Sequence, residues 1–131
     1  MAEECCSPSE ILIFTCSGSS NVGQFANQAA VDLQQEGIGK MLCLAGIGGH
    51  VSGMIASAQA GKRLIGIDGC SVACTKKTME HAGLSLTDYV LITELGFEKA
   101  PHTGAVNREA VQKVKETVKS KIIKPIRIEV K

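Results

Sequence analysis

Short runs of apolar, often β-branched residues alternate along the chain with segments whose apolar residues recur at helical spacing. Continuous apolar runs are typical of strands buried on both faces, whereas helical spacing is typical of amphipathic helices. Strands are predicted at Ile11–Phe14, Met41–Leu44, Leu64–Ile67 and Tyr89–Ile92. Helices are predicted at about 22–33, 51–60, 71–82 and 107–122, and Pro125 would introduce a short edge strand at Ile126–Val130.

This order of elements predicts the fold class. Buried strands separated by helices form a parallel sheet that is covered on both faces, with right-handed crossovers. We therefore expect a single α/β domain over residues 9–131, a three-layer doubly wound (Rossmann-like) arrangement with a mainly parallel sheet. Residues 1–8 would form a mobile N-terminal segment. Neither the strand order nor the oligomeric state follows from the pattern.

Composition and charge narrow the range of partners. The formal net charge is +1, and the lysines of the last predicted helix fall on its solvated side, so we expect neither a nucleic acid nor a membrane as partner. The N-terminus is acidic at Glu3 and Glu4 and lacks the features of a signal peptide. Apolar runs stay far below the roughly 20 residues of a membrane span, so we expect a cytoplasmic protein.

Six cysteines in 131 residues are the unusual feature of this composition. A chain of this length folds without disulfides, and cytosolic thiols stay reduced, so the cysteines indicate metal binding or thiol chemistry. Cys16, Cys43 and Cys70 recur at equal intervals, each at or near a strand end, and Cys74 follows one helical turn after Cys70. Parallel sheets form their sites beyond the carboxyl ends of the strands. We therefore expect these four thiols to meet at one edge, as a four-cysteine donor set for zinc.

Two cysteines and two histidines fall outside this group. Cys5 and Cys6 precede the first strand and are interpreted as surface thiols. His81 lies about 10 Å along its helix from Cys74, so we expect a structural role for it. His102 lies in a loop before the last helix.

The same thiols also suit a cysteine-based redox or sulfur-transfer enzyme. Cys70 would be the reactive thiol, because the positive end of the following helix favours its thiolate form. More specific motifs are absent. Low-molecular-weight phosphatases need an arginine where Val22 stands, an iron–sulfur motif would need a cysteine in place of Lys77, and a thioredoxin-like pair is one residue shorter. Whether the protein is an enzyme stays open.

A third hypothesis is a module that binds a small molecule, an anion or a nucleotide at two glycine-rich turns. Both turns precede predicted helices, whose first N–H groups suit anions, although neither matches a nucleotide-binding motif. The candidate anion-binding residues are Ser17, Gly18, Ser19, Ser20, Asn21, Gly46, Gly48 and Gly49. Two further candidates are His50, as a ligand, an acid–base group or a cap at the start of the second helix, and Asp68, which would orient a ligand or cap a helix.

Three motifs together resemble a known family. They are Cys16-Ser-Gly-Ser-Ser-Asn-Val-Gly23, Cys43-Leu-Ala-Gly-Ile-Gly-Gly-His50, and Asp68-Gly-Cys70 with Cys74-Thr-Lys-Lys77. This combination is similar to the DGC-domain family, which is named for its Asp-Gly-Cys motif, and the resemblance runs from about Ser9 to Leu95. It implies zinc binding through four cysteines, which fall on Cys16, Cys43, Cys70 and Cys74. It implies no defined reaction.

Overall fold

The computed structural model of the chain describes residues 10–101 and 104–123. Several predicted features lie outside the described residues: the N-terminal segment with Cys5 and Cys6, the loop residue His102 and the edge strand Ile126–Val130. No helix in the described part is both long enough and apolar enough to cross a membrane.

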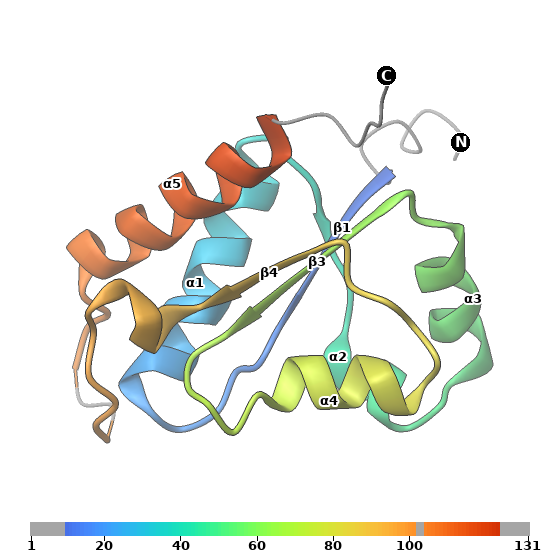
Figure 1. Ribbon diagram of the computed structural model, residues 1–131, viewed down its shortest axis with the longest axis horizontal. Helices are drawn as coiled ribbons and strands as arrows, with labels where there is room; N and C mark the ends of the chain where they lie inside the picture. Colours follow the sequence, from blue (N-terminus) through green and yellow to red (C-terminus); the bar gives the residue numbers. More distant parts are fainter. Residues whose placement is uncertain (1–9, 102–103, 124–131) are drawn as a thin grey trace.

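A parallel four-stranded sheet forms the middle layer of the described domain, which confirms the predicted α/β class (Figure 1). The strand order is β2-β1-β3-β4, and each pairing is parallel. The strands are β1 (Ile11–Thr15), β2 (Lys40–Met41), β3 (Arg63–Asp68) and β4 (Asp88–Leu91). The helices are α1 (Asn21–Gln35), α2 (Leu44–Gly48), α3 (Ser52–Ala60), α4 (Cys74–His81), the 3-10 helix η3 (Ile92–Leu95) and α5 (Arg108–Ile123).

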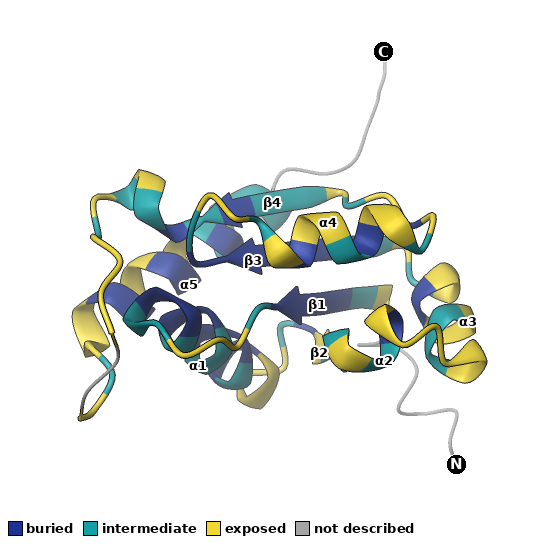
Figure 2. Ribbon diagram, turned by 90° about the horizontal axis from the view of Figure 1, so that it is seen from below, coloured by how far each residue is buried: buried dark blue, intermediate teal, exposed yellow. Residues whose placement is uncertain are grey.

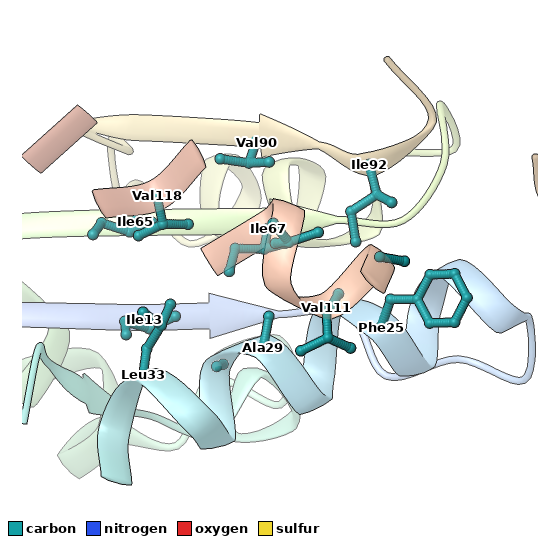
Figure 3. Packing of buried hydrophobic residues seen from close by; sticks show 14 of the residues in the cluster. Ile13, Phe25, Ala29, Leu33, Ile65, Ile67, Val90, Ile92, Val111 and Val118 are labelled. Carbon is teal, nitrogen blue, oxygen red and sulfur yellow. The ribbon is translucent and has the colours of Figure 1, made fainter. Parts of the chain in front are cut away.

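Alternation along β1 distributes its side chains between two apolar layers. Ile13 packs with residues of α1 and α5, whereas Leu12 and Phe14 pack with residues of α2, α3 and α4. All three side chains are almost fully buried, and each such burial stabilises the fold by about 1.5–3 kcal/mol. In Figure 2, β1 and β3 are coloured almost entirely as buried. Figure 3 shows the first layer, in which the labelled residues are Ile13, Phe25, Ala29, Leu33, Ile65, Ile67, Val90, Ile92, Val111 and Val118.

Ion pairs join α1 to α5 beside this core. Asp32 accepts from Arg108 at 2.8 Å, and the Nζ of Lys115 lies 3.7 Å from Asp32 and 2.5 Å from Glu36. Lys115 is buried, so the prediction that the lysines of this helix are solvated is wrong for this residue. Burial tends to raise the pKa of Asp32, but hydrogen bonds from Gln28 and Arg108 and the two nearby cations outweigh it, so the pKa lies below its ordinary value.

Two predicted boundaries are wrong, and the structure gives a physical reason for each. The second strand ends at Met41, and the glycine-rich stretch predicted as a turn instead forms most of α2. Gly46 fits there because a side chain at this position would approach Met54 to within 2.8 Å. The helix predicted from residue 71 begins only at Cys74, because Ala73 adopts a left-handed conformation with φ of 58°.

Candidate functional site

A pocket of about 450 Å³ opens beyond the carboxyl ends of β1 and β3. The loops after these two strands lie side by side at the lower left of Figure 1. The chain passes from β1 to one face of the sheet and from β3 to the other, which makes this the point where open α/β sheets form their binding crevice. Cys16, Cys70 and Cys74 line the pocket. The other lining residues are Ser17, Gly18, Ser19, Ser20, Gly23, Leu44, Gly69, Val72 and Lys99.

Cys16 lines the pocket and directly follows β1. Its side chain is half-buried, and the backbone N–H of Gly69 donates to its Sγ at 3.2 Å. Burial raises the pKa of the Cys16 thiol to about 11, against the opposing effect of the Gly69 N–H. The negative charge of Asp68 acts in the same direction as burial. Without a bound cation, Cys16 is therefore a neutral thiol near pH 7 and a poor nucleophile.

Asp68 is fully buried and acts as a helix cap from the preceding strand. Its carboxylate accepts backbone N–H groups of Thr75 at 2.7 Å and Lys76 at 3.1 Å, both in the first turn of α4. It also accepts the hydroxyl of Tyr89 at 2.8 Å. Burial and this carboxylate raise the pKa of Tyr89. Of the two predicted roles for Asp68, the geometry supports capping, and its side chain does not line the pocket.

Gly69 brings the two walls of the pocket together. A Cβ atom at this position would lie 2.7 Å from the carbonyl carbon of Val22 and 2.8 Å from the nitrogen of Gly23. Only glycine therefore permits the segment after β3 to touch the first turn of α1. In the Asp-Gly-Cys motif, the aspartate holds α4 and the glycine sets the close contact, so that Cys70 reaches the pocket.

The four predicted ligands are brought together only in part. Cys70 lies in the segment between β3 and α4, so the expected helical pairing with Cys74 is wrong. Cys74 is exposed at the first position of α4 and still lines the pocket. Cys43 is exposed, immediately precedes α2, and does not line the pocket, although its neighbour Leu44 does. Within residues 10–101 and 104–123, no three His, Cys, Asp or Glu side chains are arranged to hold a metal ion.

The predicted anion-binding turns differ from each other. Ser17 to Ser20 line the pocket together with Lys99, a cation that no sequence motif indicated. Two backbone N–H donors of the first turn of α1 already have acceptors within the protein. Gly23 N–H donates to Ser20 Oγ, and Asn21 N–H donates to the Ala100 carbonyl. Gly46 and Gly48 lie inside α2 and Gly49 at its end, and none of the three lines the pocket. Anion binding stays a prediction for the first turn. The second stretch does not form the expected turn before a helix, because its glycines belong to α2 and its end.

His50 and His81 lie together on the surface, away from the pocket lining. His50 follows α2 rather than starting a helix, and its Nε2 lies 3.1 Å from Nδ1 of His81 at the end of α4. Their separation of 31 positions hides this pair from local sequence patterns. Tyr89 was missed as well, since its strand position carries no signal for the bond to Asp68.

Comparisons with known proteins identify the family. Residues 12–118 match the model of the DGC domain. The chain is 34% identical over 88 residues to the anaerobic and virulence modulator AnvM of Pseudomonas aeruginosa, a region that covers 67% of each protein. No solved structure matches the chain. Matches over most of its length show that the chain belongs to the DGC domain family.

Proposed function

We propose that this protein binds a zinc ion through Cys16, Cys70 and Cys74, with Cys43 as the fourth ligand. The observation that carries the proposal is the position of the first three thiols around one pocket at the carboxyl ends of β1 and β3. Thiolates are preferred zinc ligands, and a four-cysteine set is typical of structural zinc sites. The donor types therefore fit the ion.

The sulfur atoms need to move toward one another for binding, since the described residues hold no ready-made group of three ligands. Cys70 lies in a non-helical segment, and Cys43 is exposed beside the short helix α2. Burial raises the pKa of Cys16 to about 11, and a bound cation would offset this effect and favour the thiolate. Zinc binding should therefore release protons and weaken as the pH falls.

The name of the Pseudomonas relative offers independent support. That protein is described as a modulator connected with anaerobic conditions and virulence. Thiolate ligands are sensitive to oxidants, so a zinc–thiolate site suits a role that differs between aerobic and anaerobic conditions.

Metal content and thiol counts test the proposal. The full chain is purified without oxygen, and zinc and free thiols are measured before and after treatment with a chelator. We expect one cysteine-dependent zinc per chain, which Cys16→Ser, Cys70→Ser and Cys74→Ser each lose, and additional reactive thiols after chelation. Cys5→Ser is the matched control, and it should retain the zinc. Substoichiometric zinc, together with thiol reactivity that the chelator leaves unchanged, would refute the proposal.

A cysteine-based redox enzyme is the second candidate. The raised pKa of the Cys16 thiol indicates which of the pocket cysteines would act in it. Because Cys16 is a neutral thiol, Cys70 and Cys74 are the pocket thiols left for catalysis. Cys70 would attack a sulfur of a substrate disulfide, form a mixed disulfide and release one substrate thiolate. Cys74 would then attack the Cys70 sulfur and release the second thiolate, so that two electrons pass from the cysteine pair to the substrate.

Alkylation rates separate this candidate from zinc binding. The enzyme hypothesis predicts one thiol that reacts far faster than the others in chelator-treated protein near neutral pH, and Cys70→Ser should abolish that fast reaction. Uniformly slow alkylation of the pocket thiols would rule it out.

A further inference from the structure

The two histidines that join α2 to α4 form a geometrically defined pair. His50 Nε2 lies 3.1 Å from His81 Nδ1, and the ring centroids are 5.1 Å apart with planes at 71°. Both side chains are exposed to solvent. One ring donates to the other, and the tautomers determine the direction.

The distance between these nitrogens matches two ligands of one metal ion. Two zinc–nitrogen bonds of about 2.0–2.1 Å at a tetrahedral angle place the nitrogens about 3.3–3.4 Å apart. The observed separation of 3.1 Å is close to this value, and the exposed rings turn so that both lone pairs point at the ion instead of along the line between the nitrogens. A hollow of about 230 Å³, lined by Gly48, Lys77, Thr78 and His81, lies beside the pair and has room for water ligands.

The backbone around His50 is arranged for this contact. His50 has a φ of 55°, in the left-handed region, where histidine is one of the few enriched side chains. Its neighbour α2 has five residues and is too short to be stable alone, so it depends on packing. Ile47 is fully buried in the layer that also contains Met79 of α4, and this contact brings His50 over the end of α4.

We propose that His50 and His81 form a surface site for a zinc ion, separate from the cysteine pocket and independent of the function proposed above. His50 binds through Nε2 and His81 through Nδ1, and water molecules complete the coordination. Both rings stay neutral, with their protons on Nδ1 of His50 and Nε2 of His81. One ring changes tautomer relative to the hydrogen-bonded pair, and no net proton is released from neutral rings.

Charge at the site gives the proposal a directional test. Lys77 lines the same hollow and precedes His81 by one helical turn, so its ammonium group opposes a bound cation. Lys77→Glu replaces this cation with a carboxylate on the same face of α4, and we expect it to tighten zinc binding by about tenfold or more. Lys113→Glu is the matched control, since it makes the same charge change at an exposed position on α5, across the sheet.

The experiment is a zinc titration of the full chain, followed by proton–nitrogen correlation spectra of the imidazole rings. These spectra observe each histidine separately, so zinc bound to cysteines does not interfere. We expect the signals of His50 and His81 to shift together and to settle in the stated tautomers, while His102 is unchanged. His50→Gly keeps the left-handed turn and should abolish the shift of His81.

Three results would overturn the proposal: rings that do not respond to saturating zinc, a response of only one ring, or a His81 shift that persists in His50→Gly. Cys70→Ser identifies which site has failed. If purified Cys70→Ser lacks the cysteine-bound zinc but its histidine signals still shift when zinc is added, both sites exist. If the histidine shifts are absent while the cysteine-dependent zinc is retained, only the histidine site is refuted.

Discussion

Replacement of Asp68 by asparagine tests whether the aspartate of the Asp-Gly-Cys motif is a helix cap or a ligand. The carboxylate is fully buried and accepts three hydrogen bonds, two from the first turn of α4 and one from Tyr89. Asparagine has the same shape but turns one acceptor oxygen into a donor. Thr75 N–H uses one oxygen and Lys76 N–H the other, so either orientation of the amide leaves one backbone N–H facing a donor.

The size of the effect follows from these contacts. A hydrogen bond to a charged group contributes about 1.5–3 kcal/mol, and a buried donor without an acceptor costs about 1–3 kcal/mol. We expect Asp68→Asn to lower the free energy of unfolding by about 3 kcal/mol, a large part of the 5–15 kcal/mol typical of a domain. Tyr89→Phe removes only the third bond and should cost about 1.5 kcal/mol.

Urea denaturation followed by circular dichroism measures both losses. Glu80→Gln is the matched control, because it neutralises an exposed acid on the same helix, and it should change stability by less than about 0.5 kcal/mol. A loss below that value in Asp68→Asn would show that the carboxylate does not hold α4 in place. Unchanged stability together with lost zinc would assign Asp68 to the metal instead.

Three further predictions concern the pocket and the acid stability. Gly69→Ala should destabilise the protein by about 2 kcal/mol or more in urea, since its Cβ meets the backbone of α1, whereas Gly53→Ala in α3, with open space around it, should not destabilise. The Cys16 thiol of metal-free protein should alkylate about tenfold faster per pH unit until about pH 11, as mass spectrometry of the labelled peptide would show, and a plateau near pH 8 would contradict its raised pKa. Because folding lowers the pKa of Asp32, its carboxylate stabilises the protein. This stabilisation is complete above the pKa of the unfolded state, about 3.9, and is lost as the pH falls through the pKa of the folded state. Urea midpoints from pH 6 to pH 2 should therefore fall less steeply in Asp32→Asn, and an unchanged slope would refute this account.

Local sequence patterns determined much of the fold. The apolar runs of β1 and β3 predict buried parallel strands correctly, because a strand covered on both faces needs apolar residues at each position. Gly37 follows the end of α1 with a φ of +79°, a left-handed conformation in which helices commonly end at glycine. The apolar run at 41–44 favours a strand, but its last residue begins α2, since apolar runs this short fit either element. Burial of Ile47 against the sheet and α4 decides between them.

For the candidate site too, the sequence determined one part and the tertiary structure decided the rest. The sequence by itself placed the cysteines at one edge, because in a parallel sheet all carboxyl ends lie on the same side, whatever the strand order. Strand order then decided which thiols share a pocket. The neighbours β1 and β3 bring Cys16 and Cys70 together, whereas Cys43 follows β2, which pairs with the other side of β1, and does not line the pocket. Similarly, contact between two helices paired His50 with His81. Such pairings depend on long-range packing, which no local periodicity records.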